Sequence, residues 1–281
     1  MQNTLENSWS LVKASARILN EDRALLLFPL MSGLAFLALM ATFLFPALLL
    51  GGVEALFGQS RALGIGLAFL LYLVQYFVAF YFNAALVGAA LIHLDGGRPT
   101  VQDGLRIASD HVKPILGYAL ISATVGLFLN SAGRRSQRGG RLVSGVLGTA
   151  WNLATFLAVP VLVTRDMGPI DALKESARLL RGTWGEQLSG MLGMGIAFGA
   201  MGTALAGASV GLVVVAAGLG PFGLVPVLLF LFVFWVLFAL ATTALQGIYR
   251  AAVYRYALTG QAGQGFESIS MRDMADLAGR R

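Results

Sequence analysis

One stretch of the sequence has the spacing of a catalytic nucleophile. Gly207-Ala208-Ser209-Val210-Gly211 matches G-x-S-x-G, the turn that presents the reactive serine of α/β-hydrolases. That turn joins a strand to a helix, whereas Ser209 lies in a Gly- and Ala-rich apolar segment typical of a helix. The two histidines of the chain, His93 and His111, are expected at the opposite end of the helices, out of reach of Ser209. We therefore predict no catalytic residue and expect that the protein is not an enzyme.

The glycines around Ser209 suggest helix packing instead. Gly195 and Gly199, and likewise Gly207 and Gly211, have the four-residue spacing that lets helices approach closely in a membrane. We expect both pairs to lie at helix contacts.

His93 and Asp95 come closest to a metal-binding pattern. No further ligands follow at a suitable spacing, and the absence of cysteine excludes disulfides and thiolate sites. A histidine at the end of an apolar helix explains His93 more simply. We predict no metal site and no cofactor.

Polar side chains inside apolar runs form the remaining candidate site. The candidates are Gln75, Asn83, Asn152, Thr155 and Gln246, and Thr242 and Thr243 lie in similar surroundings. One interpretation is hydrogen bonding between helices, worth about 0.6 kcal/mol per bond in membranes. The other is that these residues line a cavity for a polar substrate or a lipid headgroup. No run has a carboxylate at its middle, where a proton- or sodium-coupled transporter would carry one.

The elements that position these residues are six apolar runs. The chain is 57% hydrophobic and only 12% charged, with a mean hydropathy of +0.75, and a bilayer core takes about 20 helical residues to cross. The runs cover residues 24–50, 62–92, 112–130, 142–163, 188–211 and 222–249. They predict an all-α, polytopic membrane protein with six transmembrane helices as three hairpins. Residues 1–260 form its single domain, and 261–281 form a polar tail.

Basic residues set the predicted topology. If the N-terminus is cytoplasmic, most lysines and arginines fall on the cytoplasmic side, as the positive-inside rule requires. Both termini are then cytoplasmic in a prokaryotic inner membrane, and the net charge of +6 needs no nucleic-acid partner.

One loop departs from this charge pattern. Residues 131–141 contain four arginines and no acid, yet fall on the outer side; they are Arg134, Arg135, Arg138 and Arg141. One interpretation is that these arginines contact anionic lipid headgroups. The alternative is that the third and fourth runs do not both cross the membrane, which would bring the loop inside.

Short amphipathic segments precede the first, third and fifth runs. The first and last share K-x-S-A-R followed by two aliphatic residues, at 13–19 and 174–180. In the last segment Ile170, Leu173, Ala177 and Leu180 form an apolar stripe, and charged residues including Glu175 take the opposite face. We expect three cytoplasmic interfacial helices. Thr183 and Glu186 fit a capping box at the start of the fifth run.

Several motifs resemble a known family. They are Trp151-Asn152 with Val159-Pro160-Val161-Leu162, Gly168-Pro169-Ile170-Asp171-Ala172-Leu173-Lys174-Glu175-Ser176, Thr183-Trp184-Gly185-Glu186, and Ala252-Val253-Tyr254-Arg255-Tyr256-Ala257. In combination they resemble domain of unknown function 6159, an uncharacterised prokaryotic membrane-protein family. The resemblance implies six helices in a bacterial or archaeal cytoplasmic membrane and no established activity.

The sequence favours two functions. The first is a non-catalytic, membrane-embedded binding or scaffold subunit whose partners are membrane lipids and another copy or a membrane complex. The alternative is a transporter or channel for a small solute or lipid, with its site between the helical hairpins.

Overall fold

The computed structural model describes residues 2–49, 61–135, 139–184 and 193–266. Within these ranges the chain is helical and contains no strand. The elements are α1 (Gln2–Glu21), the 3₁₀ helix η1 (Arg23–Leu26), α2 (Leu27–Leu49), α4 (Arg61–Leu94), α5 (Val101–Asp110), α6 (Val112–Arg135), α7 (Gly139–Phe156), α8 (Ala158–Thr164), α9 (Pro169–Trp184), α10 (Gly193–Ala217) and α11 (Pro221–Thr259).

Five of these helices are long and apolar enough to cross a membrane. The count rises to 6 if the bent pair Ala150–Thr164 and Pro169–Thr183, whose axes differ by 118°, is one span. The all-helical fold with five to six long apolar helices therefore agrees with the class of protein that the sequence predicts.

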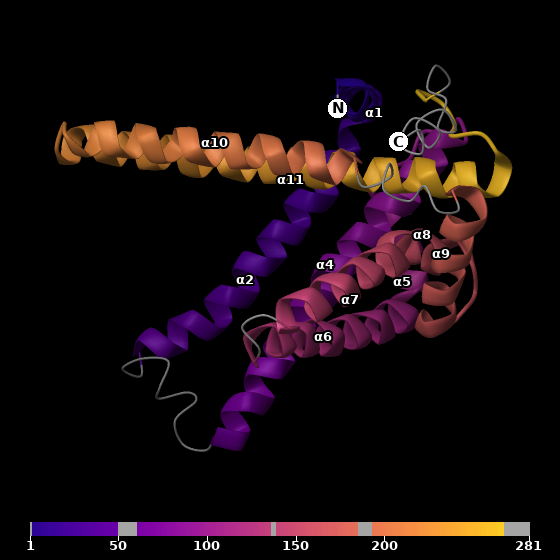
Figure 1. Cartoon of the computed structure of the whole chain (residues 1–281), viewed down its shortest axis with the longest axis horizontal. Coiled ribbons are helices and arrows are strands. Elements are labelled where there is room, and N and C mark those ends of the chain that lie inside the picture. Colours follow the sequence, from indigo (N-terminus) through magenta and orange to yellow (C-terminus); the bar gives the residue numbers. More distant parts are fainter. Residues whose placement is uncertain (1, 50–60, 136–138, 185–192, 267–281) are drawn as a thin grey trace.

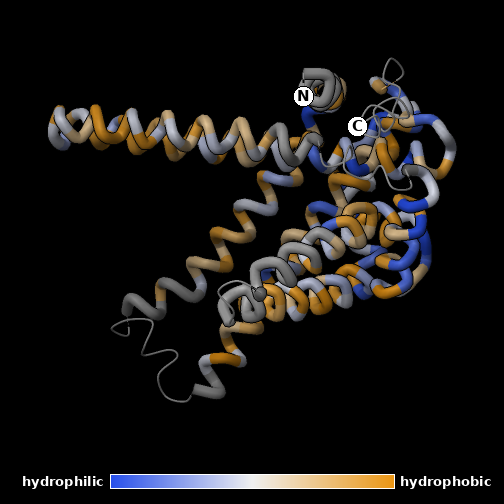
Figure 2. The backbone as a smooth tube through the Cα atoms, viewed as in Figure 1, coloured by the Kyte–Doolittle hydropathy of each residue, from blue (hydrophilic) through white to orange (hydrophobic). Residues whose placement is uncertain are grey.

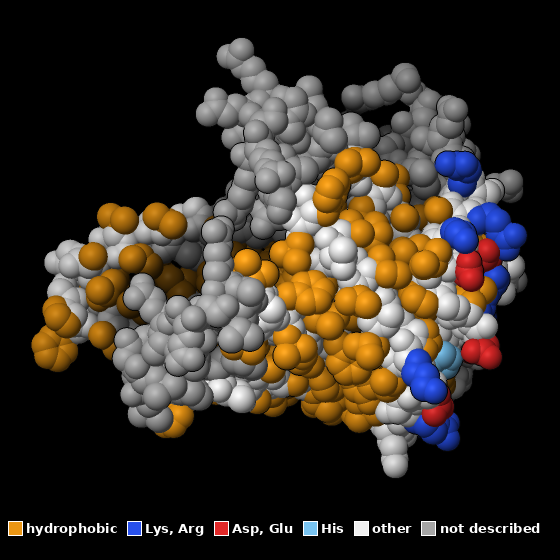
Figure 3. All heavy atoms as spheres, turned by 90° about the horizontal axis from the view of Figure 1, so that it is seen from below, with side chains coloured by type: hydrophobic (Ala, Val, Ile, Leu, Met, Phe, Trp, Pro, Cys, Tyr) orange, Lys and Arg blue, Asp and Glu red, His pale blue; other side chains and the backbone are white. Residues whose placement is uncertain are grey.

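The apolar helices extend from one polar end of the molecule. α10 and α11 pack side by side, while α2, α4, α6 and α7 run obliquely to them (Figure 1). Hydrophilic residues gather at the end where α5, α8 and α9 lie (Figure 2). Seen from below, charged side chains line the same edge, and the rest of the described surface in that view is mostly apolar (Figure 3). The molecule thus has a polar end and an apolar end.

The buried core lies toward the polar end. All residues from 84 to 90 of α4 are buried, whereas residues 64–83 are half-buried or exposed. In α11, residues 244–254 are buried except for Gln246 and Arg250, and none of residues 221–243 is buried. Buried residues of α1, η1, α2, α5, α6, α8, α9 and α10 also belong to this core.

Glycines bring the helices of the core close together. A Cβ atom at Gly104 of α5 would overlap the Phe28 ring and lie 2.7 Å from the Ala85 carbonyl oxygen. One at Gly247 of α11 would overlap the Leu86 side chain. In contrast, Gly199, Gly207 and Gly211 of α10 have no described neighbour within 4 Å of such an atom. The expectation that the α10 glycines mark helix contacts is therefore wrong for these three.

The predicted fourth run, 142–163, is divided into α7 and α8. Pro160 cannot donate the helical hydrogen bond to the carbonyl of Phe156, and its ring crowds that carbonyl. The helix breaks there, and Leu157 leaves helical geometry. The backbone N–H of Leu157 donates instead to Ser176 Oγ of α9, 3.0 Å away. The proline and the buried serine together fix the position of α9 against the break.

The buried face of α9 is not the face that the sequence predicts. In α9, Glu175 is buried and Ile170 and Ala177 are exposed, so Glu175 does not lie on the outward face as predicted. The reason is that two arginines contact its carboxylate. Ser176 and the equivalent serine of α1, Ser15, are both fully buried.

Helix boundaries also differ from the predicted runs. α11 continues to Thr259, ten residues beyond the predicted 249, and ends where Gly260 adopts a left-handed conformation with φ 74°. A capping box is present at α5, where Thr100 and Asp103 exchange hydrogen bonds of 3.0 and 3.1 Å. The predicted capping box at Thr183 and Glu186 is not described, because Glu186 lies outside the described residues. Residues 267–281 of the predicted tail also lie outside them.

Candidate functional site: a cavity among α4, α6, α7 and α11

A cavity of about 460 Å³ lies between α11 and the α6–α7 pair, with α4 along one side. This volume falls within the range of small-molecule sites, roughly 300–1,000 Å³. Its lining comes from four long helices and α8: Tyr76, Phe80, Tyr118, Ser122, Gly126, Leu129, Trp151, Asn152, Thr155, Phe156, Val159, Gln246, Tyr249 and Arg250. Residues far apart in sequence therefore meet around one space.

Aromatic rings form much of the wall. Phe80 and Tyr118 lie 4.5 Å apart between ring centroids, and Phe156 and Tyr249 lie 6.1 Å apart in an edge-on arrangement. Such pairs are favourable and hold the rings in place. Gly126 leaves room for the hydroxyl of Tyr76, which would lie 3.3 Å from a Cβ atom there. The cavity wall is therefore largely apolar, and contacts between neighbouring rings hold its aromatic side chains in position.

Polar residues also line the cavity. Asn152, Thr155 and Gln246 all line the cavity, while the other two sequence candidates, Gln75 and Asn83, are not among its lining residues. Thr155 donates to the Trp151 carbonyl of its own helix at 2.9 Å. Ser122 is 4% exposed and its hydroxyl makes no hydrogen bond to a described group. A buried hydroxyl in this state is destabilising unless another molecule pairs with it.

Arg250 brings a positive charge to the cavity. It lies nine residues before the end of α11, about 14 Å along the helix at 1.5 Å per residue. Its guanidinium carbon lies 5.7 Å from the centroid of the Phe156 ring, a cation–π contact. Within the described residues it forms no ion pair, and none of the lining residues is acidic. The described residues therefore supply no negative charge to compensate the positive charge of Arg250.

The remaining sequence candidates lie elsewhere. Asn83 is half-buried on α4, near the Gly247 backbone of α11. Arg134 and Arg135 end α6 and Arg141 lies in α7, but the side chains of all four loop arginines, Arg138 included, are outside the described part of the chain. The prediction that these arginines contact lipid headgroups thus stays a prediction.

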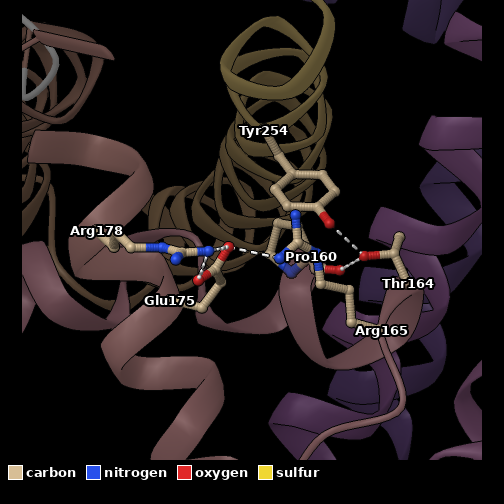
Figure 4. Close-up of polar contacts among 6 residues, drawn as sticks. All are labelled: Pro160, Thr164, Arg165, Glu175, Arg178 and Tyr254. Carbon is tan, nitrogen blue, oxygen red and sulfur yellow. Dashed lines mark hydrogen bonds and ion pairs between the residues drawn. The ribbon is translucent and has the colours of Figure 1, made fainter. Parts of the chain in front are cut away.

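Two sets of polar contacts lie where α8, α9 and α11 meet (Figure 4). The Glu175 carboxylate accepts hydrogen bonds from Arg165 and Arg178, and the bond from Arg178 is the main reason that its pKa lies below the ordinary value. The hydroxyls of Thr164 and Tyr254 bond to each other, and Thr164 also donates to the Pro160 carbonyl at 2.8 Å. These bonds join α8, α9 and α11.

Two motifs from the sequence have structural explanations. Ser209 Oγ donates to the Leu205 carbonyl at 2.8 Å and accepts from the Trp235 indole at 3.3 Å, so it joins α10 to α11.

His93 is 9% exposed, and its ring nitrogens lie 3.6 Å from Glu21 and from Asp22. Asp95 instead pairs with Arg255 at 2.6 Å. Among the described residues no group of three or more metal-ligating side chains forms.

These features define a helical protein with membrane-length apolar helices and, between them, a largely apolar cavity that a few polar residues also line. The family model of a family of unknown function, DUF6159, matches residues 62–266, and the chain belongs to this family. No curated protein and no solved structure matches the chain. The family match confirms the resemblance that the sequence motifs indicated, and it covers every residue that lines the cavity.

Sequence reasoning missed Arg250 and the aromatic wall. Because Arg250 directly follows an apolar run, the sequence indicates only that it is one of the cytoplasmic charges that set the topology. A usable signal was present: Gln246, Tyr249 and Arg250 share one face of a helix at spacings of three and four residues. The aromatic residues of α4 and α6 gave no comparable signal, because aromatic side chains are common in any apolar helix.

Proposed function

We propose that the protein is a non-catalytic, membrane-embedded binding protein whose small ligand occupies the cavity among α4, α6, α7 and α11. The single observation that carries the proposal is the convergence of Asn152, Thr155 and Gln246 on one cavity of about 460 Å³. Interhelical hydrogen bonding alone does not require that these side chains share a space.

The proposal includes a topology. In the six-span topology that the sequence predicts, with run 142–163 (α7 and α8) as the fourth span, α1, α5, α9 and the end of α11 lie at the cytoplasmic side. This is supported by the gathering of hydrophilic residues at one end of the molecule (Figure 2) and of charged side chains along the same edge (Figure 3). The cavity then lies within the cytoplasmic half of the membrane. A purely scaffolding role needs no such cavity, so we favour binding; a transporter would use the same cavity with an additional opening to the other side.

Thiol accessibility tests whether the cavity is open, because the chain has no native cysteine. Thr155→Cys places one thiol in the cavity wall. Thr242→Cys is a matched control, since Thr242 also donates to its own helix at 2.9 Å but does not line the cavity. We expect the small neutral reagent methyl methanethiosulfonate to modify Thr155→Cys at least tenfold faster than Thr242→Cys in nanodiscs.

Binding is then measured by native mass spectrometry of the protein released from nanodiscs of phosphatidylglycerol and phosphatidylethanolamine. We expect a retained lipid or small molecule on the unchanged protein. The double variant Asn152→Leu/Gln246→Leu is expected to lose it, whereas Gln75→Leu keeps it. Equal thiol rates at positions 155 and 242, or retention that the double variant leaves unchanged, would contradict the proposal.

A further inference from the structure

The cavity contains a charge without a partner. Arg250 lines it together with Tyr118, Ser122 and Phe156, and its described contact is with the face of the Phe156 ring. Charged side chains inside membrane helices nearly always pair with an opposite charge or serve a ligand pathway. Neither an ion pair to Arg250 nor an acidic lining residue is present among the described residues, so a bound anion would supply the compensating charge that these residues do not.

Neutral donors surround the same space. The Ser122 hydroxyl is buried and has no hydrogen-bond partner among the described residues, and Asn152 and Gln246, whose side chains carry amides, also line the cavity. Guanidinium, hydroxyl and amide groups are the donors that recognise phosphate and carboxylate oxygens. A neutral, apolar occupant would leave both the charge and the hydroxyl unpaired.

We infer that the cavity selects a ligand with a negatively charged group, a phosphate or carboxylate, that pairs with Arg250 while its apolar part lies against the aromatic wall. This inference rests on the proposed function and names the ligand class for the same site. The charged group belongs to a lipid headgroup or to a small soluble anion, and the experiment below separates these two sources.

Charge-selective labelling of Thr155→Cys tests the inference. Thr155 precedes Phe156, over which the Arg250 guanidinium lies. The negatively charged sulfonatoethyl methanethiosulfonate is compared with the positively charged trimethylammonium reagent, each rate divided by its rate with free cysteine. A positive site in a cleft raises the rate of an anionic reagent by roughly tenfold or more. We expect this preference with Arg250 or Arg250→Lys and its loss in Arg250→Gln.

Matched variants separate charge from folding. Gln102 is exposed on α5, so a cysteine at this position serves as a control. The ratio of its labelling rates with the anionic and cationic reagents is expected to be the same with Arg250 and with Arg250→Gln. If Arg250→Lys keeps the preference of Thr155→Cys for the anionic reagent, the positive charge is responsible for it. If Arg250 had a purely structural role, Arg250→Gln would not change the ratio of the anionic to the cationic labelling rate.

Protection experiments then identify the source of the anion. Short-chain phosphatidylglycerol, short-chain phosphatidylcholine or inorganic phosphate is added before labelling with the neutral methyl methanethiosulfonate. Slowing by phosphatidylglycerol alone indicates a lipid headgroup, and slowing by inorganic phosphate as well indicates a soluble anion. Either effect is expected to disappear in Arg250→Gln.

The failures of the two proposals are distinguishable. If the neutral reagent reacts but the charged reagents show no preference, or if phosphatidylcholine protects as well as phosphatidylglycerol, the cavity is accessible and the anion inference is wrong. Protection that persists in Arg250→Gln also overturns it. If the neutral reagent does not distinguish Thr155→Cys from Thr242→Cys, the proposed function fails and this inference fails with it.

Discussion

The two ends of α11 belong to different environments. Residues 244–254 are buried against the core except at Gln246 and Arg250, whereas no residue of 221–243 is buried. The same division runs through α4, where the buried residues between 64 and 94 are 84–90, His93 and Leu94. Tertiary packing therefore holds the polar end together, whereas the apolar side chains of the other end are left uncovered by the described chain, and the membrane that we propose would cover them.

The cavity lies where these two environments meet. The two residues that interrupt the buried part of α11 are Gln246 and Arg250, and both line the cavity. A rigid core next to a separated set of apolar helices is a suitable place for a ligand site, because the core fixes the polar groups while the helices leave space between them.

The largest contrast between the two ends is expected from adding one methyl group to a glycine. Gly104→Ala, at the polar end, would force the new Cβ atom into the Phe28 ring and toward the Ala85 carbonyl. Overpacking of this kind costs about 1–3 kcal/mol, measured as a fall in Tm of the detergent-solubilised protein. Gly207→Ala, at the apolar end, meets no described atom within 4 Å and is expected to leave Tm unchanged or raise it. A similar loss in both variants would break the comparison.

A comparable loss of stability, with a smaller contrast to its control, is expected at the buried carboxylate of the polar end. Glu175→Gln removes the charge that Arg165 and Arg178 contact and should cost about 1–3 kcal/mol, as for hydrogen bonds to charged groups. The exposed pair of Asp171 and Lys174, at 3.1 Å, is the control, because Asp171→Asn should cost less than about 1 kcal/mol.

The effect of Glu175 depends on pH in a defined direction. Its pKa in the folded protein is lowered below the ordinary 4.5, mainly by the hydrogen bond from Arg178. Such a carboxylate stabilises the protein fully above its unfolded pKa, and this contribution is lost as the pH falls through the folded pKa. The Tm difference between the unchanged protein and Glu175→Gln should therefore be constant near neutral pH and shrink below about pH 4.5. A difference that grows on acidification would contradict this account.

The smallest effect is expected at the apolar end. Ser209→Ala removes the bond from the Trp235 indole, 3.3 Å long, which should cost about 1 kcal/mol or less. Because Ser209 serves as a helix contact, ligand retention in native mass spectrometry is expected to be unchanged. Loss of retention with unchanged Tm would give Ser209 a role that the structure does not assign to it.

The sequence predicted the helical class and the long apolar helices because both depend on local composition. It also separated Asn152, Thr155 and Gln246 as unusual residues within apolar runs. It could not show that these three share a cavity while Gln75 and Asn83 do not, because that depends on how helices distant in sequence pack. For the same reason the contacts of Gly104 and Gly247 were missed, and isolated G-x-x-x-G spacings in α10 pointed to the wrong helix.

The break at Leu157 shows where local rules could have been used further. Pro160 lies within a predicted run, and a proline there removes a helical hydrogen bond. The buried position of Glu175 had no local signal, because it depends on Arg165 from the preceding loop reaching the same carboxylate as Arg178.

A cryo-EM map of the protein in nanodiscs that contain phosphatidylglycerol tests the central claim most directly. The account predicts ordered non-protein density in the cavity, with its polar part beside Arg250, Asn152 and Gln246. A cavity closed by side chains, with Arg250 paired to an acidic residue of the chain and no density between α6, α7 and α11, would contradict it.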